Sequence, residues 1–137
     1  MSRENVEIVG RALEQLAVSY RSGEATEALL DLTAPDVCVD GSHRVFNPVV
    51  YEGHAGLGRM IREIRDACDD FYEAVERVID LGDRVVVIQR IGGRGHASKV
   101  NVEQDGALIC TLRDGLLVRV EIYGDPHQAL QAVGLRE

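Results

Sequence analysis

The sequence predicts an α+β protein in which helices come first and a curled antiparallel β-sheet follows. Apolar residues recur at helical spacing across most of residues 6–68, whereas residues 71–123 are rich in Val and Ile with turn residues between the runs. Asp125 and Pro126 have the order of an N-cap and a first-turn proline, which predicts a short C-terminal helix through Val133. Such an order is typical of a sheet with helices packed on one face.

Three helices are expected in the first half of the chain. Residues 6–20 carry an apolar stripe at helical spacing, and Gly23 is placed to end that helix. A shorter stripe covers residues 25–32 and is stopped by Pro35, and a third stripe covers residues 57–68. Helices therefore occupy most of the chain before the sheet begins.

Five strands are expected, one of them early in the chain. Residues 37–40 read as a short strand, and the other four lie within residues 71–123. Tight turns are predicted at residues 80–83 and 113–116, and the glycines of residues 92–95 mark a bend between the two middle strands. The last four strands are thus expected to pair antiparallel through short connections.

Length and charge bound the class of protein. A chain of 137 residues, 45% hydrophobic and 28% charged, is expected to form a single domain, residues 1–137, around one core. Its formal charge of −8 opposes binding to nucleic acids and to anionic membranes, because both need clustered Lys and Arg. No apolar run is long enough to span a membrane and no signal segment precedes the first helix, so we expect a cytoplasmic protein.

The cysteines and histidines give no sign of a cofactor. Cys38, Cys68 and Cys110 are odd in number and far apart, which favours free thiols in a reducing compartment. No spacing of His, Cys, Asp and Glu resembles a metal site, and no glycine loop follows a strand as phosphate-binding loops do. The sequence therefore predicts no metal and no other cofactor.

Five stretches carry a resemblance to a known family. In chain order they are ENVEIVGRALEQL, SGEATEALLDLTAPDV, VYEGHAGLGRMI, VIDLGDRVVV and TLRDGLLVRVEIYGD. Together they resemble the SnoaL-like branch of the nuclear transport factor 2-like superfamily, whose fold is shared with ketosteroid isomerase and limonene epoxide hydrolase. The resemblance covers nearly the whole chain. It implies a cystatin-like cone, with a curved antiparallel sheet wrapped around the N-terminal helices, a hydrophobic pocket and often a dimer.

The last hairpin is expected to give the pocket an apolar wall. A two-residue turn pairing Leu112 with Leu117 would set charged residues beside apolar ones, whereas a three-residue turn pairing Leu112 with Leu116 gives one wholly apolar face. We favour the second pairing, whose wall consists of Leu108, Val118, Val120 and Ile122. The resemblance implies catalytic carboxylates on these strands, but the matching positions, Leu108 and Ile122, are hydrocarbons.

The stretch VCVDGSHR places a carboxylate and an imidazole three residues apart where a strand ends. Asp40 is the candidate general base, with His43 as a polar partner, provided that its carboxyl faces the cavity. Alternation along the strand opposes this, because Val37 and Val39 facing the core would turn Asp40 outward, and a polar turn is the alternative. The resemblance places the isomerase base at Gly41, which cannot accept a proton.

Glu73 and Arg90 are a second candidate pair. A two-residue Leu81-Gly82 loop would place them opposite each other on neighbouring strands. Inside the cone the pair would orient a carbonyl or bind a carboxylate, and on the outer face it would be an exposed ion pair of little energetic value. Arg90 also falls where the resemblance implies an arginine like that of epoxide hydrolases. The resemblance also implies an aspartate two residues later, but that position is occupied by Gly92.

Two tyrosines are further candidates for the cavity. Tyr20 continues the apolar stripe of the first helix, which favours a place in the core, although its hydroxyl could border the cavity. Tyr51, just before the third helix, could line the rim. We also expect a homodimer through the outer face of the sheet, with Tyr123 and Arg119 in the contact.

The sequence supports two functions of different classes. In the first, the cone takes up a small apolar molecule, and the protein, if an enzyme, is a cofactor-free isomerase, cyclase or hydrolase that uses acid/base chemistry. Asp40 would then be the base, and Arg90, His43 or Tyr51 its polar partners. In the second, a non-catalytic ligand-binding or dimerisation domain fills the pocket with its own side chains. An open cavity of several hundred Å³ would favour the first function, and a packed interior the second.

Overall fold

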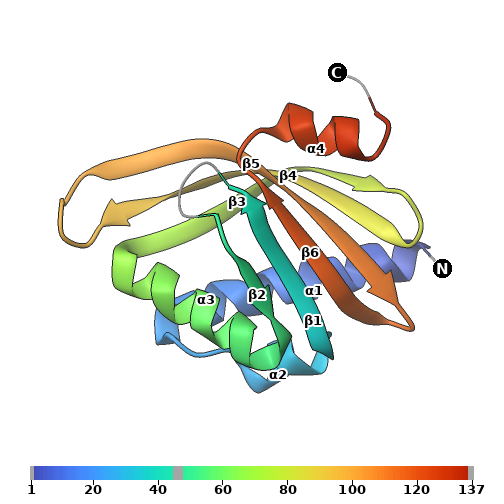
Figure 1. Cartoon of the computed structure of the whole chain (residues 1–137), viewed down its shortest axis with the longest axis horizontal. Helices are drawn as coiled ribbons and strands as arrows, with labels where there is room; N and C mark the ends of the chain where they lie inside the picture. Colours follow the sequence, from blue (N-terminus) through green and yellow to red (C-terminus); the bar gives the residue numbers. More distant parts are fainter. Residues whose placement is uncertain (1, 45–47, 136–137) are drawn as a thin grey trace.

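The computed structural model describes residues 2–44 and 48–135, which form four helices and six strands (Figure 1). In chain order they are α1 (Ser2–Ser22), α2 (Glu27–Asp31), β1 (Thr33–His43), β2 (Val50–Glu52), α3 (Gly53–Ala67), β3 (Cys68–Asp80), β4 (Arg84–Gly95), β5 (Asn101–Arg113), β6 (Leu116–Tyr123) and α4 (Pro126–Ala132). The predicted α+β class and the short C-terminal helix are both confirmed.

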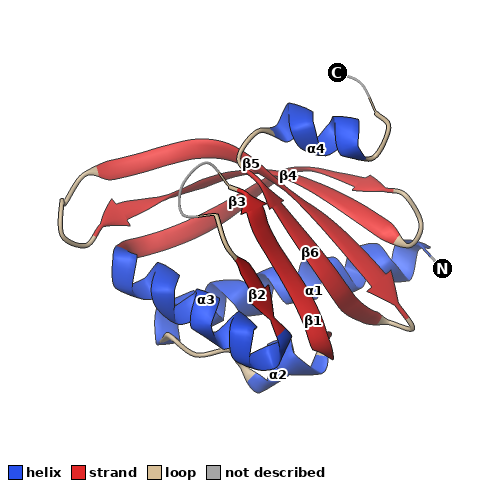
Figure 2. Ribbon diagram, in the orientation of Figure 1, coloured by secondary structure: helices blue, strands red, loops and turns tan. Residues whose placement is uncertain are grey.

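All six strands belong to one curved sheet, in the order β2-β1-β6-β5-β4-β3. Neighbouring strands pair antiparallel, except that β1 and β6 run parallel. We call the face toward α1 and α3 the inner face, and α4 packs on the opposite, outer face against β4, β5 and β6 (Figure 2). The sheet therefore wraps around the N-terminal helices, as the resemblance implied.

Side chains are buried on both faces of the central strands. Val85 and Val87 of β4 lie in the inner core, whereas Val86 between them packs on the outer face with Ile109 and Ala129. Successive residues of a strand point to opposite faces, so a continuous run of buried valines needs cover on both sides of the sheet. Helices α1 and α3 provide that cover inside, and α4 provides it outside.

Several element boundaries differ from the prediction, and β2 was not predicted. β1 begins already at Thr33 and passes through Pro35, where its pairing with β6 is irregular and tolerates a residue without an N–H. The third helix ends one residue early, and Cys68 begins β3. The glycine-rich residues 92–95 continue β4, so the chain turns after them and not within them.

The predicted pairing of the last hairpin is wrong, although its apolar inner face is present. Leu112 pairs with Leu117 across a two-residue turn, and the register then shifts by one residue at Val118. Because of this bulge, Val120 and Ile122 return to the inner face and pack against the core. The prediction assumed a regular ladder after the turn, and in a regular ladder the two-residue turn would have placed charged residues inside.

β3 contains a second bulge of the same kind. Near the hairpin turn, Ile79 points outward and packs in the cluster beneath α4. The register then shifts by one residue at Glu76. Beyond that point the odd-numbered residues face inward instead, so that Phe71 packs against the inner core and Glu73 pairs with Ile91. The bulge therefore determines which residues of β3 reach the interior.

Candidate functional site

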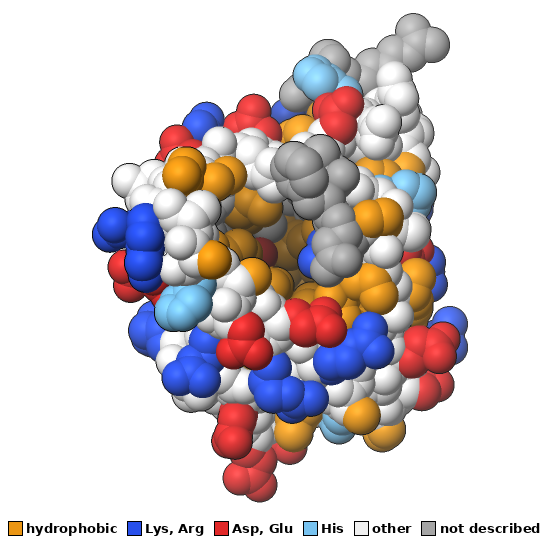
Figure 3. Space-filling view, turned by 60° about the vertical axis from the view of Figure 1, so that its left-hand side comes forward, with side chains coloured by type: hydrophobic (Ala, Val, Ile, Leu, Met, Phe, Trp, Pro, Cys, Tyr) orange, Lys and Arg blue, Asp and Glu red, His pale blue; other side chains and the backbone are white. Residues whose placement is uncertain are grey.

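A cavity of about 380 Å³ lies between the inner face of the sheet and the helices, and Figure 3 shows a hollow bordered by hydrophobic side chains. Its described lining contains two charged residues, Glu73 and Arg44. The apolar residues of the lining include Met60, Ile64, Phe71, Ile91, Leu108 and Ile122. An apolar pocket with few polar groups is the usual form of a small-molecule site.

Glu73 is the acidic residue of this lining. The bulge at Glu76 turns it to the inner face, and its side chain stays partly accessible because it borders the cavity. Burial raises the pKa of Glu73 to about 7, and a hydrogen bond from Gln89 works against that rise. A carboxyl group with this pKa is present in both protonation states near neutral pH, which suits proton transfer in either direction.

Gln89 of β4 is the hydrogen-bond partner of Glu73. Its Nε2 donates to Glu73 Oε2 over 3.1 Å, while its Oε1 is buried and has no partner among the described residues. The residue is 2% exposed and lines the same cavity. A buried carbonyl oxygen without a hydrogen-bond donor destabilises the folded protein. A ligand, or the protonated form of Glu73, would therefore be stabilised by donating a hydrogen bond to Gln89 Oε1.

Tyr20 of α1 contributes a hydroxyl to the cavity. Its ring packs edge-on against Phe71, with centroids 4.8 Å apart and planes at 78°. Burial, followed by the charge of Glu73, raises the pKa of Tyr20 well above its ordinary value, so the phenol stays protonated. The hydroxyl has no hydrogen-bond partner in the part of the chain that the structure describes. It is therefore a free donor for a ligand oxygen.

Arg44, just after β1, supplies the positive charge of the lining. Its Nη1 donates to the hydroxyl of Tyr51 over 3.4 Å, and its guanidinium lies 5.8 Å from the centre of the Tyr51 ring. Gly41 permits this position, because a Cβ there would lie 2.8 Å from Arg44 Cδ and 2.6 Å from the carbonyl oxygen of Val49. Gly41 thus makes room for a cation.

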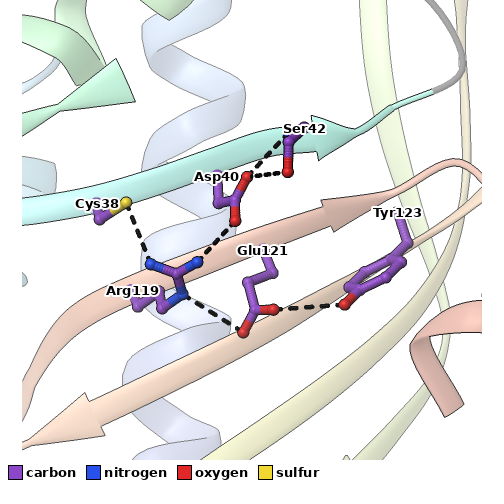
Figure 4. Close-up of polar contacts among 6 residues, drawn as sticks. All are labelled: Cys38, Asp40, Ser42, Arg119, Glu121 and Tyr123. Carbon is purple, nitrogen blue, oxygen red and sulfur yellow. Dashed lines mark hydrogen bonds and ion pairs between the residues drawn. The ribbon is translucent and has the colours of Figure 1, made fainter. Parts of the chain in front are cut away.

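Asp40 lies outside the cavity, on the outer face (Figure 4). Its Oδ2 accepts a hydrogen bond from Arg119 Nη2 over 2.6 Å, and its Oδ1 accepts from the backbone N–H and the hydroxyl of Ser42. Burial acts to raise the pKa of Asp40, but the Ser42 hydrogen bonds and the Arg119 charge outweigh it and lower the pKa. The condition for Asp40 to act as general base, a carboxyl that faces the cavity, is not met.

Arg119 is the centre of an outer polar cluster made of Cys38, Asp40, Arg119, Glu121 and Tyr123. Its Nη1 lies 3.4 Å from the sulfur of Cys38 and its Nε 3.6 Å from Glu121 Oε1, while the Tyr123 hydroxyl donates to Glu121 Oε2 over 3.4 Å. Alternation along β1 produces this arrangement, because the valines on either side of Cys38 are buried in the core. The cluster is an ion-paired surface feature.

Two other predicted catalytic residues also lie away from the cavity. The exposed His43 stacks on Tyr123, with ring centroids 4.5 Å apart and planes at 6°. Arg90 faces the outer side of the sheet and pairs with Glu103 over 2.8 Å and Asp105 over 3.3 Å. The predicted pairing of Arg90 with Glu73 is wrong. The turn lies one residue later than predicted and β3 has a bulge at Glu76, so Ala74 pairs with Arg90, and Glu73 and Arg90 face opposite sides of the sheet.

The predicted ligand-binding residues divide into two groups. The cavity lining includes Tyr20, Glu73, Leu108 and Ile122. Tyr51 is buried beneath Arg44 and its hydroxyl donates to Glu63 over 2.7 Å, so it supports the lining from behind. Val120 packs into the inner core and Val118 occupies the bulge, and neither residue borders the cavity.

Gln89 and Arg44 line the cavity but were not predicted as site residues. Gln89 is the one polar residue in the run VVVIQ, and a polar side chain within a buried strand was a usable signal. Arg44 ends the stretch VCVDGSHR, but nothing in its spacing shows that its side chain folds back over Gly41.

Within residues 2–44 and 48–135, no group of three or more His, Cys, Asp or Glu side chains is placed to hold a metal ion. Cys38, Cys68 and Cys110 are free. Among the same residues, no helix is long and apolar enough to cross a membrane.

Comparison with known proteins gives one family and many structures of the same fold. The model of the SnoaL-like domain family matches residues 14–120. TerC, solved in crystals with polyporic acid, has 23% identity and a TM-score of 0.70, with 89% of this chain and 92% of TerC covered. A protein of unknown function from Burkholderia pseudomallei K96243, described as similar to nuclear transport factor 2, has 19% identity and a TM-score of 0.72, with 96% and 98% covered.

A third similar structure is a protein with a ketosteroid isomerase-like fold from Catenulispora acidiphila, solved in complex with trimethylamine. It has 15% identity and a TM-score of 0.68, with 90% of this chain and 92% of that chain covered. The sequence search of curated proteins gave no match. At these identities the structures show the fold that the chain shares with them.

Proposed function

Because the chain belongs to the family of SnoaL-like domains, we propose that it binds a small apolar molecule in its cavity and moves a proton on it, with Glu73 as the general acid/base. The observation that carries this proposal is the position of Glu73. Among the described residues that line the cavity, Glu73 is the one acid, and burial raises its pKa to about 7. The predicted base, Asp40, is replaced in this role.

The open cavity supports the binding part of the proposal. A volume of about 380 Å³ falls within the range of roughly 300–1,000 Å³ that is usual for ligand pockets. The alternative of a pocket filled by its own side chains would leave no such space. TerC, which shares the fold, was crystallised with polyporic acid, and this supports a small organic molecule as the ligand.

The arrangement suits proton transfer next to a carbonyl group. Ionised Glu73 would accept the proton from the ligand, while the Tyr20 hydroxyl would donate a hydrogen bond to the oxygen on which negative charge develops. The apolar surroundings exclude water, which strengthens both interactions. Protonated Glu73 would then return the proton to another atom of the ligand, giving an isomerisation or a cyclisation without any cofactor.

Proton exchange tests this function without knowledge of the natural substrate. In deuterated buffer, the wild-type protein should accelerate loss of the α-proton signal of β-tetralone, a small apolar ketone, in a one-dimensional NMR time course. Glu73→Gln should remove the acceleration, because an amide cannot accept the proton. Asp40→Asn is the matched control, since it removes a carboxylate outside the cavity and should keep the rate.

Two results would contradict the proposal. Equal exchange rates for the wild type and Glu73→Gln would exclude Glu73 as the base. Binding of β-tetralone without any acceleration by the wild type would favour the non-catalytic ligand-binding alternative.

The expected homodimer and the cytoplasmic location stay predictions. Tyr123 is only 6% exposed, because it packs beneath α4, so a dimer through the outer face would rely on Arg119 and the exposed strands beside it. Sedimentation equilibrium at several protein concentrations would test for the dimer, and a single species of monomer mass would exclude it.

A further inference from the structure

Arg44 is a cation at an apolar cavity, and its guanidinium pairs with no anion of the described residues. Among the described residues, no carboxylate lies within ion-pair distance of its guanidinium, and its polar contact is the neutral hydroxyl of Tyr51. The other arginine against that ring, Arg59, pairs with Glu63 over 3.4 Å and does not line the cavity. The unpaired charge therefore belongs to the cavity wall.

The Arg44 side chain is held in place before any ligand arrives. Its stem passes over Gly41, where the missing Cβ leaves the space that it occupies. Its head rests against the buried ring of Tyr51, and Glu63 in turn fixes the Tyr51 hydroxyl over 2.7 Å. A guanidinium held in this way loses little side-chain freedom when it binds an anion.

Arg44 and Glu73 lie on different sides of the cavity. Arg44 follows β1 and Glu73 is on β3, and three strands separate β1 from β3 in the sheet. Tyr20 lines the same cavity as these two residues. A ligand that touches Arg44 at one end can therefore reach Tyr20 and Glu73 with the other.

We propose that the ligand of this cavity is an amphipathic monoanion, whose carboxylate or other acidic oxygen group pairs with Arg44 while its apolar ring system fills the space toward Glu73. This inference rests on the proposed small-molecule site and names the class of its ligand. The net charge of −8 makes the protein as a whole repel anions. Preferential binding of an anion in the cavity would therefore depend on the local positive charge of Arg44. Charge-assisted hydrogen bonds to a guanidinium are strong where water is partly excluded.

Two probes of similar shape test the inference, β-naphthoate and its uncharged methyl ketone. Isothermal titration calorimetry with the wild type should give binding of β-naphthoate at least about tenfold tighter than binding of the ketone. Arg44→Gln should remove this preference and leave ketone binding in place, which also shows that the variant is folded. Arg59→Gln is the matched control, because it removes the other arginine on Tyr51 and should keep the preference.

Gly41→Ala gives an independent check of the same contact. The added methyl group would collide with the Arg44 stem and with the Val49 carbonyl oxygen. The Arg44 side chain should therefore move, and the preference for β-naphthoate should fall although the charge is retained. Equal affinity of the two probes for the wild type, or a preference that survives in Arg44→Gln, would overturn the inference and leave the apolar site intact. Failure of both probes to bind the wild type would instead count against the small-molecule site as well.

Discussion

Gln89 and Glu73 meet on the inner face of neighbouring strands, where Gln89 Nε2 donates a hydrogen bond to Glu73 Oε2 over 3.1 Å. A glutamine amide carries both a donor and an acceptor, so it can serve both states of the carboxyl group. Its N–H stabilises the ionised form, and after rotation of the amide its buried Oε1 would accept the proton of the neutral form. The pair can therefore support a reaction in which Glu73 first takes up and then releases a proton.

Replacement of Gln89 by Leu should raise the pKa of Glu73 further above its value of about 7. The hydrogen bond from Gln89 favours the ionised carboxylate, and its loss leaves the effect of burial unopposed. A ¹³C NMR titration of the glutamate carboxyl groups would measure the shift. Gln104→Leu is the control, because Gln104 also lines the cavity but makes no hydrogen bond to Glu73; an unchanged titration in Gln89→Leu would contradict the assigned contact.

Glu73→Gln should make the protein more stable than the wild type at pH 8, and the difference should shrink toward pH 4. A glutamate with an ordinary pKa of 4.5 in the unfolded chain and about 7 in the folded protein binds more protons when folded. The wild type therefore loses stability as pH rises from 4.5 to 7, by up to about 3 kcal/mol. Urea denaturation at several pH values would measure this, and a constant difference between the two proteins would contradict it.

Asp40→Asn should destabilise the protein by about 1 kcal/mol at pH 7, because a mostly buried carboxylate loses its pairing with Arg119. The pKa of Asp40 is lowered on folding, so this contribution is present above pH 3.8 and is lost as pH falls through the folded-state pKa. Thermal unfolding at pH 7 and at pH 3 would compare the two proteins. Arg90→Gln, which breaks an exposed ion network, should leave the unfolding temperature unchanged.

Tyr20→Phe should separate stability from activity. The hydroxyl has no partner among the described residues, so its removal should leave the free energy of unfolding almost unchanged. Proton exchange on β-tetralone should nevertheless fall by roughly 100-fold, the usual effect of losing one donor to a developing oxyanion. A rate equal to that of the wild type would show that the hydroxyl does not meet the ligand oxygen.

Periodicity was sufficient to predict the α+β class, and the resemblance supplied the cone, but neither predicted the pairing of the strands. The apolar stripes of α1 and α3 and the Val-rich strands have patterns that follow directly from burial on one or both faces. The bulges at Glu76 and Val118 leave no such pattern, because an extra residue in a strand is accommodated by the backbone. The predicted pairings were already wrong at the two turns, where Leu112 pairs with Leu117 and Leu81 bonds to Arg84, and each bulge then shifted the register again by one residue.

Positions of individual site residues could be predicted only where the alternation of side chains along a strand was enough to decide which face each residue lies on. The outward direction of Asp40 followed from Val37 and Val39, and the apolar wall at Leu108 followed from its strand. The position of Arg44 depends on a turn and on a long side chain that folds back on its own strand, and local sequence does not encode that path.

The bulge at Glu76 has a consequence for how such proteins diverge. One inserted or deleted residue in an edge strand can exchange the side chains that face a ligand for those that face water, while the fold persists. A lineage could gain or lose a buried acid in this way without mutating the acid itself. Searches for the reactive group in relatives should therefore compare positions in superposed structures, because a sequence alignment can be out of register by one residue at the bulge.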